Sequence, residues 1–325
     1  MAAPHVVYKF GGTSVGTASR FRTVIDIVRR TADEGRVVAI VSAQGKVTRR
    51  LSAAMEAFTT QTDDRPAVVN ALVEDLRDRH RSQAEAVLHP DTVSLYVDVM
   101  EERLAALRAV FERVEREGFT PAARDAVLAT GEQLSVPMVT LALRDAGCTA
   151  PFCDATALVV TDATFGEATV DVGATTERVR AWYEGLAPDA VPVVAGFIGA
   201  TPSGDTTTLG FEGSDYSAAL FTHILGAGCL TRYTDVDGLY TADPETDPTA
   251  ERLDRLSMEE AFARTEAGRL GMHPKTLRPL VDAGIPMQVR SIDDPDGTGT
   301  QIVPENRSNV LFTPPVETRA PSSLP

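Results

Sequence analysis

The stretch from residue 193 to residue 244 constrains the fold of this chain more than any other. It reads as a buried apolar strand at Val193–Ala195, followed by a loop rich in Gly, Thr and Ser over Gly196–Ser214. An amphipathic helix is predicted from about Asp215 to Leu225, and a second apolar strand follows at Cys229–Thr234. A strand, a helix and a strand in this order predict a parallel βαβ unit.

The loop of this unit is a candidate anion site. A polar, glycine-rich loop that enters a helix exposes backbone N–H groups that have no partner inside the helix, and such groups suit a phosphate. The alternative is an ordinary connection between a strand and a helix, which is the commoner meaning of a lone glycine-rich loop. This loop is longer than the usual connection of about 4–6 residues, and long ordered loops tend to be functional.

Predicted strands and helices alternate along most of the chain. Strands are expected at residues 5–10, 36–41, 191–195, 229–234, 287–290 and 301–303. Helices are expected after residue 16, from residue 51 behind a polar loop, and at 121–143, 173–186, 215–225, 258–267 and 275–283. This alternation predicts an α/β fold, a three-layer αβα sandwich with a mostly parallel, open sheet. Ligands bind beyond the carboxyl ends of the strands in such sheets.

The segment from Pro66 to Gly118 is strongly helical and charged. It carries opposite charges four residues apart over an apolar stripe, as in a pair of amphipathic helices. We interpret residues 66–120 as a helical insert or lid that covers one side of the sheet. The alternative is a pair of surface helices with no chemical role, which is the usual fate of helices of this composition.

Composition narrows the function classes. The formal net charge of −15 argues against nucleic acid or an anionic membrane as the main partner, so a site for ATP would have to be locally basic. Cys148, Cys153 and Cys229 show no paired framework and no metal-binding spacing, as expected of thiols in a reducing compartment. No leader precedes the first strand, and no apolar run looks long enough to span a bilayer. We therefore expect a soluble, cytoplasmic protein.

The end of the first strand carries a candidate catalytic group. Lys9 stands there, and the paired glycines Gly11 and Gly12 follow it. The glycines would let backbone N–H groups approach a phosphate, and the lysine could neutralise charge on a transferring phosphoryl group. This is not a Walker loop, because the lysine precedes the glycines. Alone, this pattern is weak evidence for a phosphate site.

Seven further motifs follow this one in a recognisable order. The eight motifs are KFGGTSVG at 9–16, VSAxG…T at 41–48, GExL at 131–134, GFxG at 196–199, TTTLG at 206–210, GSDYSA at 213–218, TDVDGxYTADP at 234–244 and HPKT at 273–276. With them the chain resembles the aspartate kinases of the amino acid kinase superfamily over roughly residues 5–303. The resemblance implies ATP-dependent transfer of the γ-phosphoryl group to a carboxylate of a small amino acid, with L-aspartate as the best single substrate.

The resemblance also implies roles for particular residues. Lys9 would stabilise the transferring group, and Asp215 would order this lysine. The residues implied to bind phosphate are Gly11, Gly12, Thr13, Gly213 and Ser214. Those implied to face the acceptor are Ser42, Thr48, Glu132, Phe211 and Glu212, with Glu132 taking its ammonium. Those implied to bind the nucleotide are Thr234, Asp235, Tyr240, Asp243, Arg269 and Lys275, with Mg²⁺ held through ATP and not by direct protein ligation.

Each of these residues has a purely structural alternative. Ser42 and Thr48 would serve equally well as caps of the following helix. Glu132 would be a solvent-facing helix residue, as most glutamates are. Asp215 would be a carboxylate in the first turn of its helix, and Asp235 a turn former. Only their joint occurrence in the family's order favours function.

The pattern departs from the family in two places. The usual TTLGRGGSD has lost the arginine that clamps the acceptor's carboxylate, because Phe211 and Glu212 stand in place of Arg-Gly. Losing one charge-assisted contact costs about 1.5–3 kcal/mol, or roughly 10- to 150-fold in affinity. In the family's GAKVLHP motif Leu270 replaces an ATP-contacting lysine, and Arg269 is the neighbouring candidate to replace it.

These departures leave two alternatives to an aspartate kinase. The first is a related kinase of a specialised pathway that acts on a different small acceptor, and the second is a catalytically silent ligand-binding or regulatory subunit. Because the chain stops shortly after the kinase region, we expect one catalytic domain over residues 1–305, a disordered tail over 306–325 and no regulatory domains. The family likeness suggests a homodimer.

Overall fold

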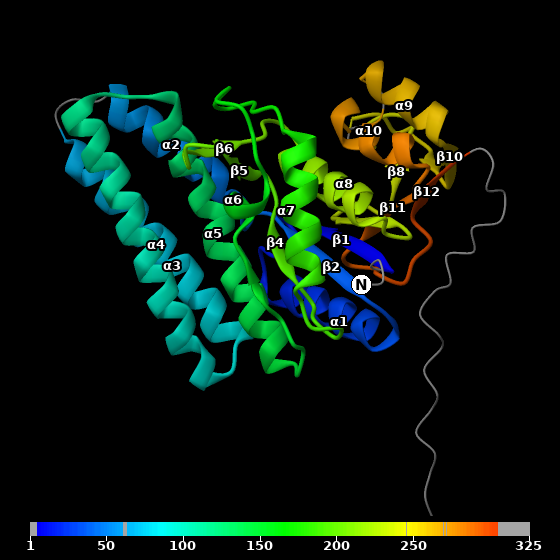
Figure 1. The fold of residues 1–325 in the computed structure, drawn as a ribbon, viewed down its shortest axis with the longest axis horizontal. Coiled ribbons are helices and arrows are strands. Elements are labelled where there is room, and N and C mark those ends of the chain that lie inside the picture. Colours follow the sequence, from blue (N-terminus) through cyan, green and yellow to red (C-terminus); the bar gives the residue numbers. More distant parts are fainter. Residues whose placement is uncertain (1–4, 61–63, 245, 269, 271, 305–325) are drawn as a thin grey trace, which may run out of the picture.

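The computed structural model describes residues 5–60, 64–244, 246–268, 270 and 272–304. Arg269 and the tail expected at 306–325 therefore lie outside the described residues. An eight-stranded sheet in the order β10-β12-β11-β7-β1-β2-β4-β3 forms the centre of the molecule (Figure 1). Its strands are β1 (Val6–Phe10), β2 (Val37–Val41), β3 (Phe152–Cys153), β4 (Val193–Ala195), β7 (Leu230–Thr234), β10 (Arg255–Ser257), β11 (Met287–Ser291) and β12 (Thr300–Val303).

The sheet is parallel except where β11 meets β12. All five residues of β2 are buried, as expected of a strand covered on both faces. On one side α1 (Ala18–Glu34) and α5 (Pro121–Asp145) pack on β2 and on each other, while α8 (Gly213–Leu225) packs on β1 and β7. The helix α8 also packs against α7 (Val172–Glu184) and α10 (Pro274–Ala283). In turn α10 packs against α9 (Met258–Glu266). The predicted three-layer αβα fold is confirmed.

Local sequence explains where the main helices begin. The side chains of Thr17, Asp64, Thr120 and Asp171 each accept a hydrogen bond from a backbone N–H in the first turn of the helix that follows. One predicted start was wrong, because α2 (Val47–Thr60) begins at Val47 and not near Leu51. Lys46 just before it has φ 69°, in the left-handed region. A polar run at a helix start looks like a loop in the sequence.

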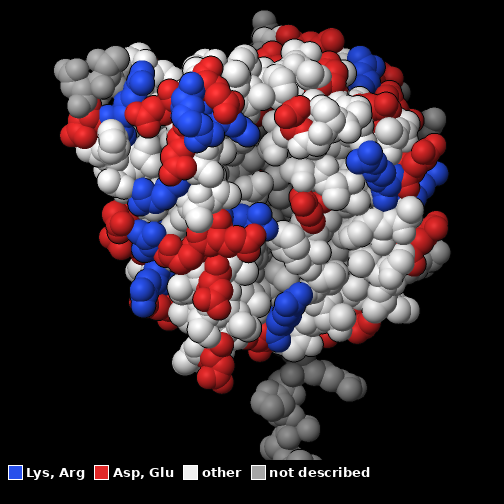
Figure 2. Space-filling view, turned by 60° about the vertical axis from the view of Figure 1, so that its left-hand side comes forward, with Lys and Arg blue, Asp and Glu red and all other residues white. Residues whose placement is uncertain are grey.

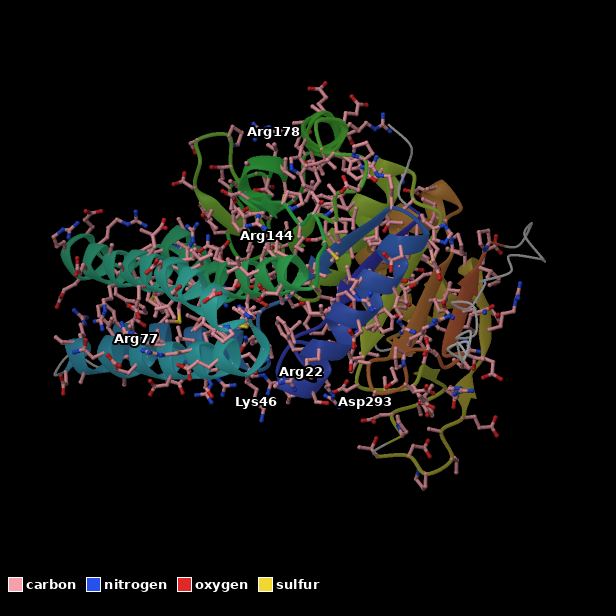
Figure 3. All side chains as sticks on the ribbon, turned by 90° about the horizontal axis from the view of Figure 1, so that it is seen from below. Arg22, Lys46, Arg77, Arg144, Arg178 and Asp293 are labelled. Carbon is pink, nitrogen blue, oxygen red and sulfur yellow. The ribbon has the colours of Figure 1, made fainter. Side chains whose placement is uncertain are left out.

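The charged segment forms a hairpin of two long helices, α3 (Arg65–Val87) and α4 (Pro90–Glu117). This hairpin packs mainly on α2 and α5, so α5 separates much of it from the sheet that it was predicted to cover. Arg77 lies between the two helices, where it forms ion pairs with Glu74 and Glu101 (Figure 3). Figure 2 shows a face of the molecule on which acidic and basic side chains are mixed in this way. An ion pair thus connects the exposed faces of the two helices, and apolar residues are buried beneath it.

The long helix α5 corrects one expectation. By length and composition this helix, Pro121–Asp145, could cross a membrane, contrary to the prediction that no apolar run is long enough. Some 83% of its apolar window is buried inside the protein, between the sheet and the helical hairpin. A helix that is apolar all round is expected in such a place. Its apolar surface is therefore explained by packing within the protein.

The predicted glycine-rich loop contains a small hairpin that the sequence pattern did not reveal. Its strands are β5 (Ile198–Ala200) and β6 (Thr206–Thr208), which pair antiparallel. Other short elements are α6 (Ala155–Leu158), β8 (Leu239–Tyr240) and β9 (Arg252–Leu253). The hairpin is anchored on α5, because Asp125 accepts a hydrogen bond from the backbone N–H of Thr208 at 2.7 Å. Asp125 also accepts one from the backbone N–H of Gly166, in the segment before α7, at 2.8 Å.

Candidate active site

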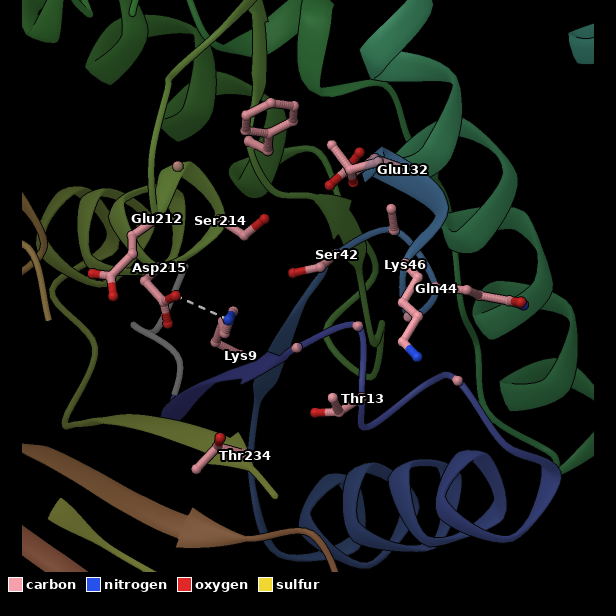
Figure 4. Close-up of a pocket in the computed structure, with 18 of the residues that line it drawn as sticks. Lys9, Thr13, Ser42, Gln44, Lys46, Glu132, Glu212, Ser214, Asp215 and Thr234 are labelled. Carbon is pink, nitrogen blue, oxygen red and sulfur yellow. Dashed lines mark hydrogen bonds and ion pairs between the residues drawn. The ribbon is translucent and has the colours of Figure 1, made fainter. Parts of the chain in front are cut away.

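Two predicted catalytic residues that are far apart in the chain are in contact. Lys9, the residue before the last in the strand β1, donates a hydrogen bond from Nζ to Oδ2 of Asp215 at 3.0 Å (Figure 4). Both side chains are buried, with exposed fractions of 8% and 7%. Asp215 reaches this position because α8 starts at Gly213 above the carboxyl ends of β1 and β7. The contact lies where parallel sheets bind ligands.

A second cation meets the same carboxylate. Nε of Arg232 lies 3.1 Å from Oδ1 of Asp215, close enough for an ion pair but without hydrogen-bond alignment. Burial by itself raises the pKa of the Asp215 carboxyl, but the charges of Arg232 and Lys9 outweigh this effect and hold the pKa below its ordinary value. Asp215 is therefore a carboxylate anion clamped between two cations.

These groups lie in a cavity of about 840 Å³. The predicted site residues that line it are Lys9, Gly11, Gly12, Thr13, Ser42, Thr48, Glu132, Glu212, Gly213, Ser214, Asp215 and Thr234. They come from the ends of β1, β2 and β7, the starts of α2 and α8 and the middle of α5. The fold thus gathers most of the predicted residues in one place, although their individual roles stay predictions.

The two loops that follow β1 and β2 meet at the floor of this cavity. A Cβ added to Gly12 would lie 2.6 Å from the carbonyl oxygen of Ala43, so only glycine permits this approach. Around Gly11 there is more space, because its added Cβ would meet Nζ of Lys9 at 3.5 Å. Gly12 is thus explained by the contact between loops, and Gly11 leaves room beside the lysine.

Glu132 is a fully buried carboxyl group at one end of the cavity (Figure 4). Burial raises its pKa from 4.5 to about 8, since backbone N–H groups and the charge of Lys9 offset only part of the desolvation. Among the described residues, Oε2 of this carboxyl has no hydrogen-bond partner. The structural alternative of a solvent-facing glutamate is therefore wrong. A carboxyl with an unused oxygen beside a cavity suits a cationic group of a ligand.

Phe211 and Glu212, which replace Arg-Gly in the family motif, lie in different surroundings. Phe211, predicted to face the acceptor, is 73% exposed and is absent from the cavity lining. The chain turns sharply at Glu212, with φ 54° and ψ 26°, and this turn directs the neighbouring Phe211 outward. Glu212 lines the cavity, where its Oε2 accepts a hydrogen bond from the backbone N–H of His273 at 2.6 Å. The structure thus corrects the placement of Phe211 at the acceptor.

The predicted nucleotide-binding residues are only partly brought together. Thr234 lines the cavity, whereas Asp235, Tyr240 and Asp243 lie on the segment that leads away from it and do not line it. The hydroxyl of Tyr240 donates to Asp237 at 2.6 Å. Lys275 also lies outside this cavity, and its Nζ donates to the carbonyl oxygen of Leu209 at 2.7 Å, a bond that ties α10 to the loop before α8.

The cavity is locally basic within an acidic protein. Six basic side chains and three acidic ones line it, and five of the basic residues were missed in the sequence. These five are Arg20, Lys46, Arg49, Arg79 and Arg232. Lys46 lies within a quoted motif and could have been found there. Arg79 comes from the helical hairpin, so this segment contributes to the cavity wall and is more than a surface feature.

Comparison with known proteins gives a consistent result. The model of the amino acid kinase family matches residues 4–291. Lysine-sensitive aspartokinase 3 of Escherichia coli is 31% identical over 94% of this chain, and the chain covers 66% of its length. A bifunctional aspartokinase/homoserine dehydrogenase of Arabidopsis thaliana is 30% identical over 96% of this chain, which spans only 34% of that protein.

A solved structure gives the same result for the fold. The crystal structure of E. coli aspartokinase III in complex with aspartate and ADP superposes with a TM-score of 0.83 at 30% identity, over 92% of this chain and 64% of that one. The resemblance to aspartate kinases that the motifs predict is confirmed over this part of those proteins. The chain belongs to the amino acid kinase family.

Proposed function

We propose that this chain is an ATP-dependent aspartate kinase, which transfers the γ-phosphoryl group of ATP to the side-chain carboxylate of L-aspartate and forms 4-phospho-L-aspartate. The observation that carries this function is the contact between Lys9 and Asp215 inside a basic cavity that also holds the buried carboxyl of Glu132. The similar E. coli aspartokinase III has been crystallised with aspartate and ADP, which supports both proposed ligands.

The cavity has an acceptor end and a nucleotide end, with Lys9 and Asp215 between them. Lys9 neutralises charge on the transferring group, and Asp215 holds the lysine in place, because phosphoryl transfer requires positioning and charge neutralisation more than covalent help. Glu132, with Ser42 and Thr48 nearby, receives the ammonium and hydrogen-bonding groups of the amino acid. Thr234 faces the nucleotide end. Mg²⁺ enters with ATP; the described residues contain no cluster of three or more His, Cys, Asp or Glu that could hold a metal ion.

The other predicted properties belong to the same proposal. Cys148, Cys153 and Cys229 are free thiols, which supports a cytoplasmic location. Asp235, Tyr240 and Asp243 remain candidates for the nucleoside. The predicted homodimer needs a measurement of mass in solution.

Turnover tests the function directly. Release of ADP is measured with L-aspartate, with L-glutamate and with N-acetyl-L-aspartate, which lacks the ammonium that Glu132 would bind. We expect L-aspartate to be used and the acetylated compound to be rejected. Replacing Lys9 by Ala should lower kcat by about 10²- to 10³-fold, the usual loss for one group that stabilises developing charge. Arg178→Ala is the control, because Arg178 is exposed and, within the described ranges, donates a hydrogen bond only to the carbonyl oxygen of Ala157.

Two results would contradict the assignment to aspartate. Turnover of another acceptor with none of L-aspartate would favour a kinase of different specificity, the alternative that Phe211 and Glu212 raise. No binding of Mg-ATP in calorimetry by the wild-type protein would favour a silent ligand-binding subunit. The comparisons favour neither of these alternatives.

A further inference from the structure

Arg232 has a position that no motif of the chain explains. It lies in the strand β7, and in the parallel register of β1 and β7 it stands directly opposite Lys9. Residues opposite one another in neighbouring strands point to the same face of a sheet, so both cations face α8. Arg232 lines the same cavity as Lys9, with a side chain that is only 17% exposed. A buried arginine needs a compensating anion.

The anion that it meets is already shared. Asp215 gives one oxygen to Lys9 at 3.0 Å and approaches Arg232 with the other at 3.1 Å. Two full positive charges therefore face one negative charge. The other buried carboxyl of the cavity, Glu132, adds little negative charge at neutral pH, because burial raises its pKa to about 8. Around Asp215 the cations therefore outnumber the carboxylates.

The hydrogen-bonding capacity of Arg232 is also unused. A guanidinium has five N–H donors, and within the described part of the chain none of those of Arg232 makes a hydrogen bond, although Nε is buried. Buried Nε atoms without a partner also occur at Arg36, Arg50, Arg79, Arg103 and Arg290, but none of these arginines pairs with Asp215. Two arginines elsewhere show the paired arrangement. Arg20 donates to both oxygens of Asp293, and Arg77 does the same with Glu101. An arginine with free donors beside a shared carboxylate is a ready site for an oxyanion.

We propose that Arg232 binds the phosphates of the nucleotide as a second cation beside Lys9, an inference that rests on the proposed kinase function. The acceptor end is marked by Glu132, and Figure 4 shows Thr234 on the other side of Lys9 from Glu132. Arg232 is two residues before Thr234 in the same strand, so it belongs to the nucleotide end. One edge of the guanidinium faces Asp215, and the remaining donors face phosphate oxygens.

Calorimetry with two probes tests this role. Mg-ADP and adenosine are titrated into the wild-type protein, Arg232→Gln and the surface control Arg178→Gln. We expect Arg232→Gln to bind Mg-ADP about 10- to 150-fold more weakly, the loss of one or two charge-assisted hydrogen bonds. Adenosine has no phosphate, so its affinity should change by less than about twofold. Arg178→Gln should leave both affinities unchanged.

The comparison of the two probes separates phosphate binding from a merely structural role. Unchanged affinity for Mg-ADP in Arg232→Gln overturns the inference, and so does an equal weakening of both probes, which would mean a general loss of the site. If thermal melting shows that Arg232→Gln does not fold, Arg232→Lys replaces it. Lysine keeps the charge beside Asp215 but cannot bridge to phosphate with a planar fork, so a several-fold loss for Mg-ADP alone is expected, and no loss refutes the role. A wild-type protein that binds no Mg-ADP overturns the kinase function itself.

Discussion

Replacing Glu132 by Gln should change how the stability of the protein depends on pH. The folded protein raises the pKa of this carboxyl from 4.5 to about 8, chiefly by burial. Between these two pH values the folded protein holds a proton that the unfolded chain has released. Stability therefore falls as the pH rises through this window, and the loss is complete above pH 8. Glutamine does not titrate, so the stability of the variant should not fall with pH in this way.

The size of the effect follows from the two pKa values. At about 1.36 kcal/mol per unit, the full displacement from 4.5 to about 8 corresponds to at most about 5 kcal/mol. Over the range from pH 6 to pH 9 only the upper part of the window is crossed. In that range the wild-type protein should lose about 3 kcal/mol more than Glu132→Gln. At pH 6 the wild-type protein should already be about 2 kcal/mol less stable than Glu132→Gln, because its unfolded chain ionises above pH 4.5. The two proteins should be similar only below this pH, where the carboxyl is protonated in both states and resembles an amide in shape.

The assay is unfolding by urea at pH 6 and pH 9, followed by circular dichroism. Glu115→Gln is the control, since Glu115 lies exposed on α4 and should show the wild-type dependence on pH. Equal pH dependence in Glu132→Gln and the wild type would refute the reasoning. A second measurement adds saturating L-aspartate, whose ammonium would hold Glu132 ionised, so that the wild-type protein loses less stability at high pH.

Three further substitutions test the packing around the site. Gly12→Ala would place a Cβ 2.6 Å from the carbonyl oxygen of Ala43, so we expect a loss of about 1–3 kcal/mol in urea unfolding; an unchanged midpoint would contradict this close approach. Asp125→Ala leaves the buried N–H of Thr208 without its acceptor, and we expect a loss of about 2–5 kcal/mol in unfolding free energy in the same assay. An unchanged unfolding free energy would show that this hydrogen bond does not stabilise the fold. Phe211→Ala should change stability by less than about 0.5 kcal/mol and leave the KM of the acceptor unaltered, because its ring is 73% exposed; a raised KM would return Phe211 to the acceptor site.

The fold was largely readable from the order of apolar runs and turn residues. A continuous apolar run such as Val37–Val41 has one good explanation, a strand covered on both faces, and the structure buries all five residues. Short elements could not be found in this way. The strands Ile198–Ala200 and Thr206–Thr208 have three residues each, too few for a period to show, and they lie within a loop that is polar overall. The order of strands in the sheet leaves no trace in local pattern.

The site was readable only in part, and mainly through the order of its motifs. Lys9 and Asp215 are 206 residues apart, and no periodicity connects them. Arg232 was missed because its meaning depends on the register between two strands, which places it opposite Lys9. Phe211 was misplaced because a motif read as a line of letters does not show the left-handed turn at Glu212. The motif does not reveal which way a side chain points after the backbone turns.

The two ends of the cavity carry opposite electrostatic costs in the ligand-free protein. At one end burial keeps Glu132 protonated. At the other end Arg232 shares Asp215, the one carboxylate that it meets among the described residues, with Lys9. An ammonium at Glu132 and phosphates at Arg232 would each remove one of these costs. Phosphates would pair the charge of Arg232, and an ammonium would let Glu132 ionise with a partner beside it, so each ligand relieves an unfavourable feature of the site. The folded chain should thus gain stability from nucleotide and amino acid together, by an amount set by their concentrations relative to their dissociation constants. The features that look least stable in the free protein are then the ones that select an amino acid at one end and a nucleotide at the other.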